Sequence, residues 1–152
     1  MNHIQHILKT HSKIPFEPLP TLKDMSVSIK TLELSSKSLA TLEKIGDDIV
    51  LSIRTDIQGF KRKFLLSQQI ARISLGQLDK VSKIEINDLN IEKPTSLLDE
   101  LANQETFELL TPKKEVKKIT AKSGDIEEIA DYFGVLEPVM YTRLKALKVI
   151  TD

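Results

Sequence analysis

The stretch that decides the fold is Phe64-Leu65-Leu66-Ser67-Gln68-Gln69-Ile70-Ala71-Arg72-Ile73-Ser74-Leu75-Gly76-Gln77-Leu78. Its apolar residues recur every three or four positions and form a broad stripe, which is typical of a helix packed on more than one side. With Asp56 as a candidate N-cap and Gly76 suited to the C-terminal end, we expect a helix from 56 to about 75. Gln68 and Arg72 lie one turn apart and share a face of the predicted helix. Two polar side chains on a helix of the core need an explanation.

Composition limits the classes of protein that fit this chain. Its 152 residues suit one domain with its own core, and 40% hydrophobic and 29% charged residues are typical of globular proteins. The 22 Lys and Arg balance the 22 Asp and Glu, which argues against a globally basic nucleic-acid binder. Cysteine is absent, which excludes disulfides, zinc ribbons and thiol catalysis, and no apolar run reaches the roughly 20 residues of a membrane span. We therefore expect a cytoplasmic protein that does not enter the membrane.

The residues before the central helix predict a small sheet. Alternating apolar and polar residues over 25–34 predict a half-buried strand, and the apolar run at 49–53 predicts a more buried one. Gly46-Asp47-Asp48 is a turn signal between them. Residues 36–45 favour a short helix, because their leucines and isoleucine recur every third position.

The N-terminus predicts a short amphipathic helix followed by a break. Prolines 15, 18 and 20 lack backbone N–H groups, so we expect residues 14–21 to be extended or turning. All histidines lie in or near this first helix, and their spacing without an acidic partner does not favour a metal site. These residues are His3, His6 and His11.

The central helix also carries a recognisable motif with altered residues. The segment Lys63-Phe64-Leu65-Leu66-Ser67-Gln68-Gln69-Ile70-Ala71-Arg72 follows a hydrophobic strand and precedes Leu75-Gly76-Gln77-Leu78. It resembles the signature of the ImmA/IrrE family of zinc metallopeptidases: a basic residue, Phe, an apolar pair, His-Glu-x-x-His and an aliphatic tail. In HExxH enzymes the two histidines bind zinc and the glutamate acts as the general base.

The resemblance places Gln68, Gln69 and Arg72 at the three positions that carry the family's chemistry. A glutamine amide is a poor zinc ligand and cannot act as a base, and a guanidinium repels a metal cation. The resemblance therefore implies a pseudoenzyme with a degenerate site, no bound metal and no cofactor.

A second motif follows in Leu101-Ala102-Asn103-Gln104-Glu105-Thr106-Phe107-Glu108, which precedes Leu109-Leu110-Thr111-Pro112. It is similar to the family's Glu-Ala-Asn/Asp-x-Phe-Ala-x-x-Leu-Leu-Met-Pro helix, whose first Glu is the third zinc ligand. The resemblance puts Leu101 at that ligand position, so this ligand is absent too. Glu100 lies one position away, a rotation of about 100° around a helix.

We expect a metal-free polar network to occupy the altered site. A buried guanidinium without a partner would be costly, so Arg72 should pair with Glu100 or Glu105 while Gln68 completes the hydrogen bonds. The alternative is that Gln68, Gln69 and Arg72 face solvent in an open groove.

The C-terminus predicts a helix at 126–133, a turn at 134–138 and a second helix from about Met140. Asp131-Tyr132-Phe133-Gly134-Val135 and Tyr141-Thr142-Arg143-Leu144-Lys145-Ala146-Leu147 look like the family's closing segment. The resemblance thus runs from about Asp47 to Ile150. It implies an α+β, zincin-like domain with a small sheet packed on the central helix and a helical C-terminal end. Residues 1–112 would form the degenerate metallopeptidase-like core, with 113–152 packed on the same domain.

The same C-terminal helices resemble a helix-turn-helix, which offers a DNA-binding transcriptional regulator as an alternative. Cationic side chains there could contact phosphates or a partner. Against this reading, no Asn, Gln or Arg cluster begins the second helix to read base edges. The simpler interpretation is that the lysine run is a solvated helix face and that Arg143 anchors the tail through a carboxylate. The candidate contacts are Lys113, Lys114, Lys117, Lys118, Arg143 and Lys145.

Active members of the family commonly act on or beside helix-turn-helix repressors of mobile elements and stress responses. The resemblance therefore implies a bacterial or phage regulatory module that binds a protein partner, such as a repressor or a toxin–antitoxin component. An enzyme of another type is the remaining alternative. It has little support, because the chain has no cysteine, no histidine in its core and no Gly-rich phosphate loop.

Overall fold

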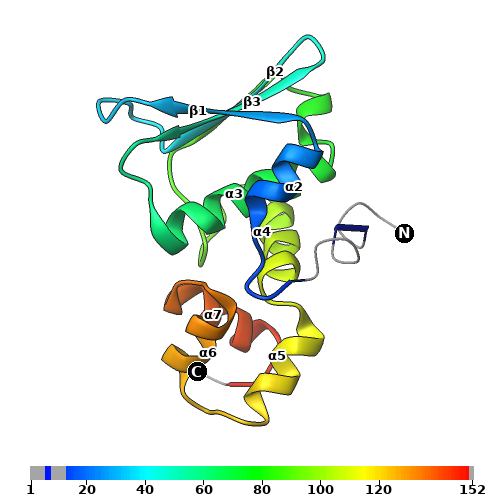
Figure 1. Cartoon of the computed structure of the whole chain (residues 1–152), viewed down its shortest axis with the longest axis vertical. Helices are drawn as coiled ribbons and strands as arrows, with labels where there is room; N and C mark the ends of the chain where they lie inside the picture. The colour runs from blue at the N-terminus through cyan, green and yellow to red at the C-terminus, as the bar shows by residue number, and fades with distance from the viewer. Residues whose placement is uncertain (1–5, 8–12, 151–152) are drawn as a thin grey trace.

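The computed structural model describes residues 6–7 and 13–150 of the chain. A four-stranded mixed sheet lies at one end, with helices beneath it and a group of short helices at the other end (Figure 1). The strands are β1 (Val27–Leu32), β2 (Ala40–Ile45), β3 (Asp48–Arg54) and β4 (Lys83–Ile86), in the order β1-β3-β2-β4. β1 runs parallel to β3, and the other neighbours are antiparallel. The expected α+β class is confirmed.

β2 corrects the expected helix at 36–45. Alternate residues Ala40 and Leu42 are fully buried, and Leu42 lies opposite Leu51 of β3. Gly46, with a φ of +62°, begins the two-residue connection to β3, as the turn signal predicted. The backbone N–H and C=O groups of β2 form hydrogen bonds with β3 on one side and β4 on the other. These contacts with distant strands outweigh the local helical preference that the spacing of its apolar residues indicates.

The N-terminal segment becomes helical earlier than expected. Helix α2 (Pro18–Asp24) shows that the expected extended segment at 14–21 is wrong from Pro18 onward. A proline in the first turn of a helix is tolerated, because the N–H group that it lacks would have no intrahelical acceptor there. Most of the expected first helix, including His3 and His11, lies outside the described residues. His6 and Ile7, which the structure does describe, are helical.

Helix α3 (Gly59–Ser74) lies beneath the sheet and beside α2 (Figure 1). Every residue from Phe64 to Arg72 is buried, so the helix is packed on all sides along its middle. It begins later than expected, because Asp56 binds the guanidinium of Arg54 instead of capping the helix. After the C-cap Leu75, Gly76 turns the chain with a φ of +73°, as expected for the end of this helix.

The chain continues through a short 3-10 helix, η1 (Gln77–Asp79), and β4 to α4 (Leu97–Leu110), which packs against α3. The C-terminal helices are α5 (Lys113–Thr120), α6 (Ile126–Phe133) and α7 (Glu137–Ala146). One hydrophobic cluster extends from the sheet through α3 and α4 to these helices. No helix in the described ranges is long and apolar enough to cross a bilayer.

Three distant segments meet where α6 ends. Gly134 adopts a φ of +68° and ends the helix, with the Val135 N–H donating to Ala130 O. A Cβ atom at position 134 would lie 2.5 Å from Lys63 Nζ and 3.1 Å from Pro15 Cβ. Glycine is therefore required there both by its backbone conformation and by the close approach of its neighbours.

Gly134→Ala should destabilise the protein by about 1–2 kcal/mol from the left-handed conformation, with a further penalty from contact with Pro15. The expected fall in Tm is about 3–8 °C, measured by circular dichroism. Gly124→Ala is the matched control, since nothing lies within 4 Å of an added Cβ atom there. Equal Tm values for the two variants would contradict this account.

Candidate functional site

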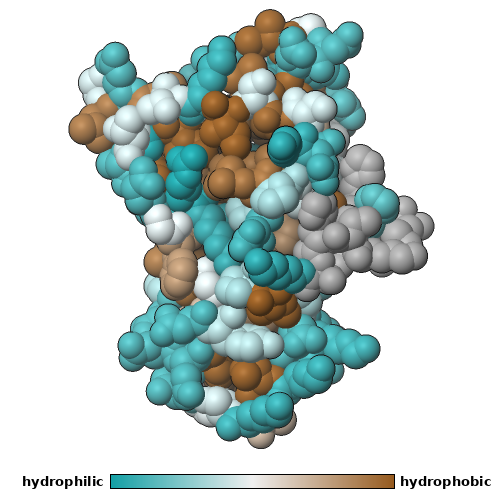
Figure 2. Space-filling view, in the orientation of Figure 1, coloured by the Kyte–Doolittle hydropathy of each residue, from teal (hydrophilic) through white to brown (hydrophobic). Residues whose placement is uncertain are grey.

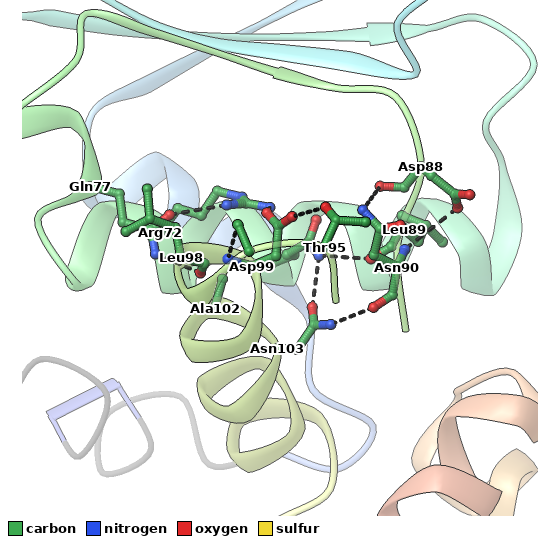
Figure 3. A network of polar contacts seen from close by, with 12 residues as sticks. Arg72, Gln77, Asp88, Leu89, Asn90, Thr95, Leu98, Asp99, Ala102 and Asn103 are labelled. Atoms are coloured by element: carbon green, nitrogen blue, oxygen red, sulfur yellow. Dashed lines mark hydrogen bonds and ion pairs between the residues drawn. The ribbon is translucent and has the colours of Figure 1, made fainter. Parts of the chain in front are cut away.

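A buried polar network joins α3 to α4 and to the loop before α4 (Figure 3). Gln68 and Gln69 are fully buried and Arg72 is 4% exposed. The alternative in which these three side chains face solvent in an open groove is therefore wrong. Gln68 and Arg72 share one face of α3 because they are four residues, or about one helical turn, apart.

The guanidinium of Arg72 forms an ion pair with Asp99. Arg72 Nη2 donates to Asp99 Oδ1 at 2.8 Å, and Arg72 Nη1 donates to Gln77 Oε1 at 3.0 Å. The second carboxylate oxygen of Asp99 accepts from Thr95 Oγ1 at 2.9 Å. Arg72 does have the expected carboxylate partner, but the expectation that it is Glu100 or Glu105 is wrong.

Helix geometry explains this correction. Asp99 and Asn103 are one turn apart on the face of α4 that meets α3, whereas Glu100 is rotated by about 100° and is exposed. Glu105 lies half-buried away from Arg72; burial raises the pKa of its carboxyl, and the charge of Glu108 raises it further.

The glutamine amides complete a second part of the network. Gln68 Nε2 donates to Asn103 Oδ1 at 2.8 Å and to Leu89 O at 3.1 Å. Asn103 Nδ2 donates to Asn90 O at 2.7 Å, and Gln69 Nε2 donates to Gln68 Oε1 at 3.1 Å. Gln68 therefore completes hydrogen bonds as expected, but with Asn103 and the loop instead of with Arg72.

Leu101 does not join this network. Its side chain is 37% exposed and lies about 200° around the helix from Asn103. The structure thus brings Gln68, Gln69 and Arg72 together and leaves Leu101 at the surface. The places on α4 that face Gln68 and Arg72 belong to Asn103 and Asp99.

Sequence reasoning missed three contributors to the site: Asp99, Asn103 and Gln77. Asp99, Asn103 and Thr106 recur at helical spacing on one face of α4, a polar stripe beside buried apolar positions. That periodicity was the available signal, because a polar stripe on a buried helix face indicates a hydrogen-bonded partner. Gln77 follows Gly76 in η1, and no local pattern predicts its contact with Arg72.

The ionisation of Asp99 follows from its contacts. Partial burial raises the pKa of its carboxyl, but the hydrogen bond and charge of Arg72, with hydrogen bonds from Thr95 and Ser96, together hold that pKa below its usual value. A carboxyl with a lowered pKa stabilises the fold above its unfolded pKa, and this contribution is lost as the pH falls through the lowered value. The ion pair should therefore persist at neutral pH.

The network is not completely satisfied. Within the described part of the chain, Arg72 Nε and Gln69 Oε1 are buried without a hydrogen-bond partner. Each such group retains a desolvation penalty, which offsets part of the stability from the other hydrogen bonds.

A polar pocket of about 270 Å³ opens beside the ion pair. Both carboxylate oxygens of Asp99 are engaged, by Arg72 and Thr95, which leaves this group poorly suited to act as a general base. Among residues 6–7 and 13–150, no group of three or more His, Cys, Asp or Glu side chains is arranged to hold a metal ion. The pocket is lined by Arg72, Glu85, Ile86, Asn87, Asp88, Asn90, Thr95 and Asp99.

The candidate cationic contacts fall into two groups. The lysines of α5 are exposed while Val116 is buried, so this helix presents a solvated basic face, and the C-terminal helices look mainly hydrophilic in Figure 2. Lys145 is also exposed, with Nζ 5.5 Å from the centre of the Tyr141 ring. The exposed α5 lysines are Lys113, Lys114, Lys117 and Lys118.

Arg143 is not a surface contact. It is buried, with Nη2 donating to Glu108 Oε1 at 2.6 Å and Nε donating to Thr111 O at 3.1 Å. The interpretation that it anchors the tail through a carboxylate is confirmed. Its assignment as a nucleic-acid or partner contact is wrong, because its donors are used inside the protein.

Neither a scan against protein-family models nor a search of curated proteins found a match to this chain. The family resemblance therefore depends on the motifs themselves.

Asp99→Ala should lower the free energy of unfolding by about 3 kcal/mol, because it leaves the Arg72 guanidinium buried beside a neutral neighbour. Glu100→Ala is the control: the residue is adjacent but exposed, and its loss should change stability by less than about 0.5 kcal/mol. Equilibrium unfolding in urea measures both values. Similar stability of the two variants would show that the ion pair does not hold α4 on α3.

Proposed function

We propose that this chain is a non-catalytic ImmA/IrrE-like pseudopeptidase with a zincin-like fold. Its role is that of a regulatory protein-interaction module, whose partner is a helix-turn-helix repressor or a toxin–antitoxin component. The observation that carries the proposal is the Arg72–Asp99 ion pair. It supports the proposal because Arg72, which matches a zinc-binding histidine of the resembling motif, has an internal carboxylate as its partner.

The order of elements is compatible with the resemblance. The central, half-buried strand β3 precedes the helix that carries the altered motif, and α4 packs directly against that helix. The first motif position, Gln68, is hydrogen-bonded to α4 through Asn103. A protein released from metal binding is expected to replace metal coordination by contacts of this kind between the same two helices.

The outer face of α4 supports a role in binding. Leu97, Leu98 and Leu101 are 68%, 49% and 37% exposed and lie together on the first turns of the helix. A contiguous group of exposed apolar side chains of this kind is a feature of protein-interaction surfaces. Two neighbouring carboxylates, Glu100 and Glu105, would favour a partner with basic residues at its edge.

The DNA-binding alternative is weakened by the burial of Arg143. It retains the exposed lysines of α5 and Lys145, which could contact phosphates without reading a sequence. We therefore keep the protein partner as the leading proposal.

Protein purified without a histidine tag should contain far less than one zinc per chain after incubation with zinc and dialysis. The reason is that the motif positions carry amides and a guanidinium in place of imidazoles and a carboxylate. Elemental analysis by mass spectrometry measures the content. Equimolar zinc that survives dialysis would overturn the pseudopeptidase assignment.

Leu97→Ser combined with Leu101→Ser should weaken binding to a helix-turn-helix repressor that binds the wild-type protein by at least about tenfold, since leucines buried at an interface contribute through apolar contact. Calorimetric titration of the purified repressor measures the Kd. Leu34→Ser is the matched control, because Leu34 is a 67% exposed leucine outside α4. Unchanged affinity of the α4 variant, or equal loss in the control, would reject this surface.

A further inference from the structure

A second pocket, of about 340 Å³, lies between α3 and the segment that leads into α2. Its walls are mainly apolar, and two basic side chains, Arg62 and Lys63, enter it from α3. Nothing in the proposed function uses this pocket. Its lining residues are Pro15, Phe16, Glu17, Pro18, Leu19, Pro20, Gly59, Arg62, Lys63 and Leu66.

The amine of Lys63 lies at the contact between α3 and α6. Lys63 Nζ donates to Phe133 O at 2.9 Å, the carbonyl of the last residue of α6. Gly134 approaches the same amine so closely that a Cβ atom added at position 134 would lie 2.5 Å from Lys63 Nζ and 3.1 Å from Pro15 Cβ. One side of the amine thus contacts the C-terminal helices, while the lysine also lines the pocket.

This environment favours the neutral amine. Burial lowers the pKa of Lys63 to about 8, although the carboxylate of Glu17 opposes the change. Phe133 O is a neutral acceptor and does not compensate the charge as a carboxylate would. Near pH 8 a large fraction of the lysine therefore has a free electron pair, as a nucleophilic amine requires.

We propose that Lys63 is an acylation site for small acyl phosphates, and that its acylation loosens the C-terminal helices from α3. The neutral Nζ attacks the acyl carbon, so that an N–C bond forms while the C–O bond to phosphate breaks. Phosphate leaves with that bond's electron pair, and the amine releases one proton to water. No oxidant or reductant is needed.

Arg62 and the pocket walls suit this class of reagent. A guanidinium binds phosphate oxygens well, and the Arg62 side chain has no ion-pair partner within the described ranges. The apolar walls formed by Phe16, Leu19 and Leu66 can accommodate a short acyl chain. Glu17, with Oε1 3.2 Å from Lys13 Nζ, is the acidic residue of the lining.

The consequence follows from the position of Nζ. Acylation removes the positive charge and adds bulk at a point that contacts Phe133 O and lies close to Gly134. The hydrogen bond from α3 to the end of α6 must then lengthen or break. The buried anchor formed by Arg143 remains, so the helices should loosen locally without unfolding the protein.

The reactivity is tested with acetyl phosphate on the full chain between pH 6.5 and 9.5, with peptide mass spectrometry to give the initial rate at each lysine. At pH 7.5 Lys63 should react about tenfold faster than Lys61, an exposed lysine outside this pocket, because burial lowers the pKa of Lys63 and Arg62 lines the same pocket. The rate at Lys63 should level off above pH 8. Arg62→Ala should slow acetylation at Lys63 alone. Equal rates at the two lysines would overturn the proposed site.

The structural effect is tested by hydrogen–deuterium exchange on residues 126–146. Acetylated wild type and Lys63→Gln should exchange faster in this segment, whereas Lys61→Gln should match unmodified protein. The acetylated wild type keeps the test informative where a variant folds poorly. Unchanged exchange in protein fully acetylated at Lys63 would overturn the proposed loosening.

Discussion

The buried guanidinium of Arg72 constrains how α3 and α4 can pack. It is only 4% exposed at the wall of the polar pocket, where an unpaired charge would cost several kcal/mol, so a carboxylate must be brought to it. Asp99 meets this need only when α4 has its observed rotation. The hydrogen bond from Gln68 to Asn103, one turn further along α4, requires the same rotation. Two independent polar contacts therefore set the register of the two helices.

The position of the remaining helices follows from α3 and α4. Arg143 of α7 binds Glu108 and Thr111 O at the end of α4, and Lys63 of α3 binds the end of α6. The first contact combines charge with a buried donor, while the second joins an amine to a neutral carbonyl. The polar contact at the end of α6 is therefore weaker than the polar contact of α7. This difference is the physical basis for a local response at Lys63.

Local sequence rules predicted the parts of the fold that local forces determine. The buried repeat of α3, the turns at Gly46 and Gly76 and the helix ending at Gly134 all follow from periodicity and backbone preference. The sequence-based predictions were wrong where contacts with residues distant in the sequence determine the local structure. β2 gains its strand conformation from two neighbouring strands, one of which lies beyond α3 in the sequence. At the site, the presence of a polar network followed from the residue types on α3. The identity of its acidic residue did not follow from the sequence, because the adjacent positions 99 and 100 both carry carboxylates. Only Asp99 faces α3, and Glu100 is exposed.

The network also explains why the outer face of α4 is apolar. Buried ion pairs are seldom more stabilising than well-packed leucines, and here Arg72 Nε and Gln69 Oε1 have no hydrogen-bond partner among the described residues. A more stable core would place leucines between the helices and charges outside, whereas α4 has Asp99 and Asn103 inside and Leu97, Leu98 and Leu101 exposed. Rotating α4 to bury these leucines would expose Asp99 and leave the Arg72 guanidinium buried without its carboxylate partner. The ion pair therefore keeps the leucines at the surface. That arrangement is costly for an isolated monomer but consistent with a helix that binds a partner.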